Sequence, residues 1–270
     1  MSALDGLLAD GDLLFLVETV LPERNDQEHI VSIIRDDADF VEAMLGHEKV
    51  SQRLLNDEEI LLKVSPQLFF AALLQKARRD LRAGSYTVER RQGQTVAVFD
   101  SRQAADLLDE RPVRNYLAAM LASFSQVRSA TRRVRVRQGV WRRQHFNDLD
   151  IDGLIRNCNA VDERERFRFY KRIADVCLFL AGMFPESIEA ERHGPNRSPL
   201  ARGNTCHSIE DYEREGQTFY SLAARHEGVR ASKLADALAA LAANFTLAEK
   251  PLTFISNHYL QLRKHNLFEM

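Results

Sequence analysis

The sequence predicts a mainly α, multi-helical protein with two small β-hairpins, near residues 86–99 and 132–143. Three observations support this class. Apolar residues recur at the three-to-four spacing of a buried helix face over most of the chain, and the spacing changes to strict alternation in two short stretches. Gly and Pro are also sparse, at 12 and 7 of 270 residues, and 45% of residues are apolar, so the chain can form an ordered core.

The first part of the chain is expected to form consecutive helices. In the second of these, Ile30, Ile33 and Ile34 are predicted to share a buried side. Ser65-Pro66 is a strong start signal, because a capping hydroxyl precedes a proline at the first helical position. The expected helices run from Gly11 to Leu21, from Asp26 onward, over 37–45, 48–55 and 57–64, and from Pro66 to Gly84.

The two alternating stretches are each interrupted by a turn that contains glycine, at Gly93 and Gly139. The predicted strand pairs are Tyr86–Arg90 with Thr95–Phe99, and Arg133–Arg137 with Val140–Arg143. Between the two hairpins, helices are expected over 101–108 and 112–126. After the second hairpin the chain is expected to be helical again, over 152–161, 163–184, 209–225 and 232–245 and after Pro251, with a long polar loop between Glu191 and His207.

Charge divides the chain into blocks. Residues 1–64 carry 15 acidic and 5 basic side chains, residues 65–147 carry 6 acidic and 16 basic ones, and the remainder is close to neutral. From Arg111 to Asn147 there are nine arginines and no Asp, Glu or Lys. These arginines need an external anion or an acidic surface of the same protein or of a copy of it. We expect two domains, residues 1–147 and 148–270.

The arginines of the second hairpin are the main candidate binding residues. Guanidinium groups form bidentate bonds with phosphate, and a neighbouring Trp can stack on a base. The expected partner is therefore nucleic acid or an acidic protein surface. The candidate contact residues are Arg128, Arg132, Arg133, Arg135, Arg137, Trp141, Arg142 and Arg143, with Arg78, Arg79 and Arg82 on the preceding long helix.

Two structural forms of this surface remain open. Short helices at 48–55 and 57–64, a longer one at 66–82 and a hairpin at 86–99 follow the order of a winged-helix domain, although the long helix begins with apolar residues where a recognition helix usually has polar ones. Alternatively, the acidic N-terminal segment pairs with the basic middle segment, within one chain or between copies of a homo-oligomeric scaffold.

A second alternative is a small-ligand sensor. Asp175 lies among apolar residues and must find a partner, either Arg172 or a tyrosine hydroxyl, and a helical pocket lined by Tyr170, Asp175, Tyr212 and Tyr220 would suit a small molecule. Asp148, Asp150 and Asp152 resemble the start of a calcium-binding loop, but the loop lacks its bidentate Glu, so helix capping is expected and no metal. No cofactor is expected.

The sequence favours a non-enzymatic protein, because it contains no glycine-rich phosphate loop, nucleophile elbow or zinc-protease motif. Cys158, Cys177 and Cys206 are too few and too irregularly spaced for a disulfide framework or a zinc site, and the first two fall on apolar helix positions. The start of the chain lacks a signal peptide, and the most apolar stretch is shorter than the roughly 20 residues of a membrane span. We therefore expect a cytoplasmic protein without membrane contact.

The stretch from Arg166 to Pro185, with Asp211-Tyr212 and Gly216–Tyr220 after it, resembles a pattern in uncharacterised helical proteins of bacteria. This resemblance covers little beyond the C-terminal half. It implies a bacterial cytoplasmic protein and implies no activity.

Overall fold

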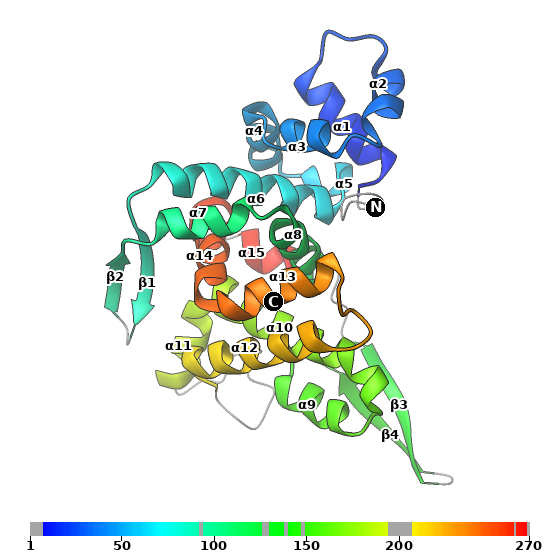
Figure 1. Cartoon of the computed structure of the whole chain (residues 1–270), viewed down its shortest axis with the longest axis vertical. Helices are drawn as coiled ribbons and strands as arrows, with labels where there is room; N and C mark the ends of the chain where they lie inside the picture. Colours follow the sequence, from blue (N-terminus) through cyan, green and yellow to red (C-terminus); the bar gives the residue numbers. More distant parts are fainter. Residues whose placement is uncertain are drawn as a thin grey trace. The chain divides into compact units, whose positions relative to one another are not determined.

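The computed structural model describes residues 8–91, 94–125, 130–137, 140–146, 149–193, 207–261 and 263–268, and it confirms the mainly α class (Figure 1). Helices α1 to α8 are Asp10–Val20, Gln27–Ile34, Ala38–Leu45, Glu48–Asn56, Ile60–Lys63, Pro66–Ala83, Ser101–Asp109 and Arg111–Phe124. Helices α9 to α15 are Ile151–Asn159, Glu163–Met183, Pro185–His193, Ile209–Arg225, Lys233–Ala243, Phe245–Ile255 and Arg263–Leu267, with a π-helix at Ser256–Leu260. Strand β1 (Thr87–Arg91) pairs with β2 (Gln94–Val98), and β3 (Ala130–Arg137) pairs with β4 (Val140–Phe146).

The chain divides into two compact units, each assembled from separate stretches of sequence. Unit 1 takes its residues from 1–89, 96–125 and 250–261, and unit 2 from 90–95, 126–249 and 262–270. The predicted division into 1–147 and 148–270 stays a prediction, because these units are defined by contacts and not by independent folding.

Asp12 joins the starts of two helices in unit 1. Its buried carboxylate accepts hydrogen bonds from the Ser65 backbone N–H at 2.8 Å and from the Ser65 hydroxyl at 2.6 Å. The Ser65 hydroxyl also accepts from the Leu68 backbone N–H at 3.1 Å, which is the predicted cap of α6. The amino end of α6 is thus fixed against α1.

The core of unit 1 forms where α6 packs against α7 and α8. Leu73, Leu74, Leu108, Val113 and Leu117 are fully buried. Val113 and Leu117 lie one turn apart on α8, whereas every residue of α6 from 68 to 75 is buried, so this part of α6 is buried on all sides and not along one stripe.

A C-terminal stretch completes unit 1. The Tyr259 hydroxyl, in the π-helix, donates a hydrogen bond to Asp80 of α6 at 2.6 Å, and burial raises the pKa of this tyrosine. Lys250 forms a 3.4 Å ion pair with Asp100, and both side chains are largely buried. These two contacts join residues that are far apart in sequence. They hold α6 to the π-helix and the start of α7 to α14.

Unit 2 is organised around α10, which packs against α9 and α12. Helix α12 begins with a capping box in which the Ser208 hydroxyl accepts from the Asp211 N–H and the Asp211 carboxylate accepts from the Ser208 N–H. The hydrogen bonds that the Asp211 carboxylate accepts from the Ser208 backbone N–H and from Arg214 lower the pKa of Asp211 to about 2. Further along α12, the absence of a side chain at Gly216 leaves room for the buried ring of Phe245.

Three local predictions differ from the structure. Residues 185–193 form α11, so helix extends past Glu191, where the loop was predicted to begin. Pro251 lies inside α14 instead of preceding the last helix, because Phe245, Ala248, Leu252 and Ile255 are all fully buried on one side of this helix. Ile33 is 61% exposed, whereas Ile34 is buried.

Candidate nucleic-acid interface

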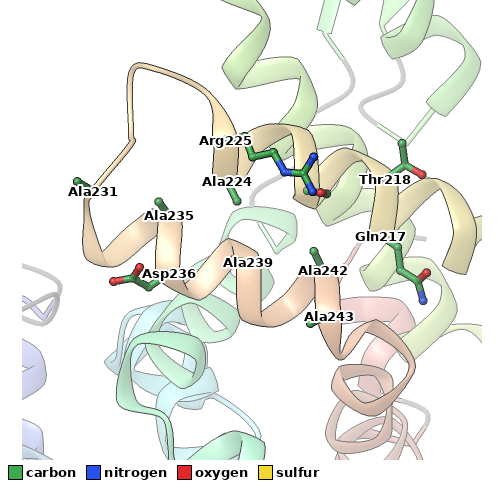
Figure 2. A pocket seen from close by; sticks show the side chains of 11 residues that line it. Gln217, Thr218, Ala224, Arg225, Ala231, Ala235, Asp236, Ala239, Ala242 and Ala243 are labelled. Atoms are coloured by element: carbon green, nitrogen blue, oxygen red, sulfur yellow. The ribbon is translucent and has the colours of Figure 1, made fainter.

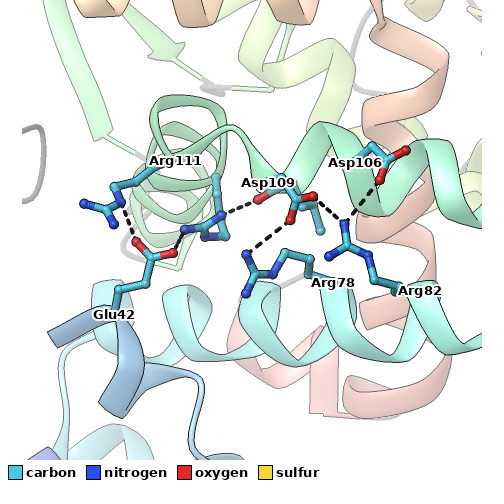
Figure 3. Close-up of polar contacts among 8 residues, drawn as sticks. Glu42, Arg78, Arg82, Asp106, Asp109 and Arg111 are labelled. Carbon is cyan, nitrogen blue, oxygen red and sulfur yellow. Dashed lines mark hydrogen bonds and ion pairs between the residues drawn. The ribbon is translucent and has the colours of Figure 1, made fainter. Parts of the chain in front are cut away.

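The three candidate arginines of α6 are engaged in ion pairs within unit 1, and Figure 3 shows those of Arg78 and Arg82. Arg78 lies 3.3 Å from Asp109, and Arg82 contacts both Asp109 and Asp106 of α7. Arg79 lies 3.2 Å from Glu48 of α4. Helices α4, α5 and α6 and the β1–β2 hairpin do follow one another in winged-helix order, but these ion pairs partly neutralise the charge of the long helix.

Acidic residues of the N-terminal segment also pair with α8. Arg114 is buried with 3% of its side chain exposed, and it donates hydrogen bonds to Glu42 and to the Leu108 carbonyl oxygen. Burial outweighs this partner and lowers the pKa of Arg114. Arg111 pairs with Asp39 and Glu42, and the pKa of Arg111 is raised by its hydrogen bond to Asp39. Arg111 and Arg114 of the basic middle segment thus pair with acids of the N-terminal segment within one chain.

Apart from Arg128, the remaining candidates lie in strands β3 and β4. The strands are antiparallel, and the register sets Arg133 opposite Arg143, Arg135 opposite Trp141 and Val134 opposite Arg142. An irregularity between Arg135 and Arg137 interrupts the alternation that would place residue 137 on the same face as residues 133 and 135. Arg132 lies opposite Gln144. The candidate Arg128 lies outside the described residues.

The structure brings two of the four predicted pocket residues together. Asp175 is buried and accepts hydrogen bonds from the Tyr220 hydroxyl at 2.9 Å and from Lys171 at 2.7 Å. A tyrosine partner for Asp175 was one of the two predicted alternatives. Tyr170 instead lies beside the rings of Phe219 and His226, and Tyr212 lies beside His207.

The acidic loop acts as a helix cap where it is described. Asp150 accepts a hydrogen bond from the Gly153 N–H at 3.0 Å at the start of α9, as expected for a capping residue. Asp152 lies 3.5 Å from His207 Nε2. Asp148 and Cys206 lie outside the described residues, and no cluster of three metal-ligating side chains occurs among those that are described. Cys158 and Cys177 are buried, and burial raises the pKa of both thiols.

A groove that the sequence did not suggest runs along helices α12 and α13 (Figure 2). Its volume is about 660 Å³, and alanines make up much of its lining. The sequence has no periodic pattern of large apolar residues at these positions, because most of the lining residues are small. The groove forms only when the two helices pack together.

Glu249 of α14 is a buried acid, and it gives a prediction about pH. Its Oε1 has no hydrogen-bond partner within the described part of the chain, and burial, with Glu213 nearby, raises its pKa well above the ordinary 4.5. As the pH rises from 4.5, the unfolded chain releases this proton before the folded one does, so folding stability falls. Glu249→Gln is expected to melt at a higher temperature than the wild type at neutral pH, and the difference should shrink towards pH 4.5.

Thermal melts between pH 4 and pH 8 check this expectation. Glu227→Gln, at an exposed position of the same unit, is the matched control and should follow the wild type. An equal response of both variants would contradict the role of Glu249.

Comparison with protein-family models, with curated proteins and with solved structures finds no match to this chain. Among the described residues, no helix is both long and apolar enough to cross a bilayer.

Proposed function

We propose that this protein is a non-enzymatic regulatory or assembly protein that contacts nucleic acid through the β3–β4 ribbon. The supporting observation is the strand register, which sets Arg133 directly opposite Arg143. Like charges in opposed positions destabilise a strand pair. The sequence from 126 to 146 contains no Asp or Glu that would relieve this repulsion locally. A phosphate backbone would relieve it, since each guanidinium can bind a phosphate group.

The secondary structure of the segment suits this partner. A two-stranded antiparallel ribbon fits the major groove of a duplex, and β-ribbon proteins contact DNA in this way. The arginines of α6 and α8 contribute less to the proposal, because Asp106, Asp109 and Glu42 already pair with them. The ribbon is therefore the proposed contact, and the helix arginines are proposed to stabilise unit 1.

The test is fluorescence anisotropy with duplex DNA, single-stranded DNA and RNA at low and moderate salt. The ribbon variant replaces Arg133, Arg135 and Arg143 by Gln. If each arginine contacts a phosphate, the variant should bind more weakly to every sequence, and the slope of log affinity against log salt should fall by about three. The melting temperature should not fall, because the replacement removes the repulsion between the opposed Arg133 and Arg143.

A matched control separates a local contact from the overall charge. Arg102, Arg164 and Arg230 are exposed helix or turn residues outside the ribbon, and their replacement by Gln changes the net charge equally. This control should keep most of the affinity. Equal losses in both variants, or no binding by the wild type at low salt, would contradict the proposal.

A further inference from the structure

The α12–α13 groove has the form of a helix-packing surface. The two helices are consecutive in sequence and pack against each other in unit 2. Each contributes one face at the spacing of successive helical turns, with Thr218, Ser221 and Arg225 on α12 and Asp236 and Ala239 on α13. The other lining residues include Ala235 and Ala242, and such small side chains let another helix approach closely, so that its side chains can fill the space between them.

Two charges of opposite sign line the same groove. Arg225 ends α12, and Asp236 lies in the first turn of α13, so both are close to the turn that joins the helices (Figure 2). Both residues are exposed. Neither forms an ion pair with another described residue. Leu222, on α12 next to the groove residue Ser221, is 41% exposed and adds an apolar side chain to the same helix.

We propose that the groove is the interface of a symmetric dimer, in which the α12–α13 hairpin of a second copy occupies it. A two-fold interface must be complementary to itself, and a surface that carries both an arginine and an aspartate meets this requirement. If the two-fold axis runs along the hairpin, α12 of one copy lies on α13 of the other. Arg225 of each copy then meets Asp236 of the other copy, so two ion pairs form around the axis, and four helices share one core.

This inference does not depend on nucleic-acid binding, so the test uses the full chain alone. Sedimentation velocity across the micromolar range should show a monomer–dimer equilibrium for the wild type. Ala239→Glu places a charge in the middle of the groove at an exposed helix position and should shift the protein to monomer at every concentration. Ala190→Glu, at an exposed position of α11, is the matched control and should dimerise as the wild type does.

A charge exchange tests the arrangement of the two copies. Arg225→Asp alone and Asp236→Arg alone each bring like charges together across the axis and should weaken the dimer at least tenfold. The double variant Arg225→Asp/Asp236→Arg restores opposite charges and should recover most of the affinity. Circular dichroism melts confirm that each variant is folded.

Three results would overturn the inference. A wild type that is monomeric at every concentration excludes the dimer. A dimer that Ala239→Glu leaves unchanged places the interface elsewhere. A double variant no tighter than the single variants excludes the proposed pairing of Arg225 with Asp236.

Discussion

Arg114→Met is expected to destabilise unit 1 by about 3–5 kcal/mol, the range for removing one partner of a buried ion pair. Arg114 is 3% exposed, and its guanidinium bonds both to Glu42 and to the Leu108 carbonyl oxygen. Methionine preserves much of the buried volume but satisfies neither oxygen. Glu42, which is only 17% exposed, would retain Arg111 as its sole partner among the pairs described above. Urea unfolding followed by circular dichroism measures the loss.

Two companion variants distinguish burial from charge. Arg111→Met removes a more exposed partner of the same carboxylate and should cost about 1 kcal/mol or less. The double variant Glu42→Leu/Arg114→Met removes the buried charge together with its partner and should recover much of the stability lost in Arg114→Met. A small loss for Arg114→Met, equal to that of Arg111→Met, would mean that the pair is effectively solvated.

Gly216→Ala is expected to destabilise unit 2 by about 2 kcal/mol, within the range measured for overpacked cores. A methyl group at position 216 would overlap the ring of Phe245 and would lie 3.1 Å from Cys177 Cβ. Both neighbours are fully buried, so neither can move into solvent. The higher helix propensity of alanine, worth up to about 1 kcal/mol, would offset only part of the overlap. The melting temperature measures the net effect.

Gly11→Ala is the matched control for this substitution. Gly11 also lies in a helix, but an added methyl group there meets nothing within 4 Å. Alanine should therefore raise stability slightly, by up to about 1 kcal/mol. If both variants changed stability in the same direction, steric overlap at residue 216 would not be the cause.

Local sequence signals were sufficient to place most of the helices. Ser65-Pro66 marks the start of α6, and Asp150 caps α9, because these signals depend on neighbouring backbone N–H groups. The helix start predicted at Pro251 is wrong. A proline is unfavourable inside a helix, but the burial of Phe245 before it and of Leu252 after it stabilises α14 across this position. Tertiary packing of this kind leaves no local signal.

The partners of charged residues were predictable only as classes. The sequence indicated that arginines need acids, but not that Arg114 would reach Glu42, which lies 72 residues away. For Asp175 the sequence indicated an arginine or a tyrosine as partner. The Tyr220 hydroxyl, 45 residues later in the chain, is one of the partners that the structure shows. The α12–α13 groove was not predicted, since alanines that line a groove cannot be distinguished in sequence from alanines on any other helix face.

The hydrogen bond between Tyr259 and Asp80 spans 179 residues and has a consequence for synthesis on the ribosome. Unit 1 lacks its stretch 250–261 until that stretch has been synthesised, whereas the stretch 126–249 of unit 2 emerges earlier as one continuous segment. Contacts of such long sequence separation form late and slowly. During translation, the stretches 1–89 and 96–125 therefore form an incomplete unit, in which the apolar surface that 250–261 covers is exposed. In this interval the uncovered apolar surface favours aggregation and is a surface that a chaperone can bind.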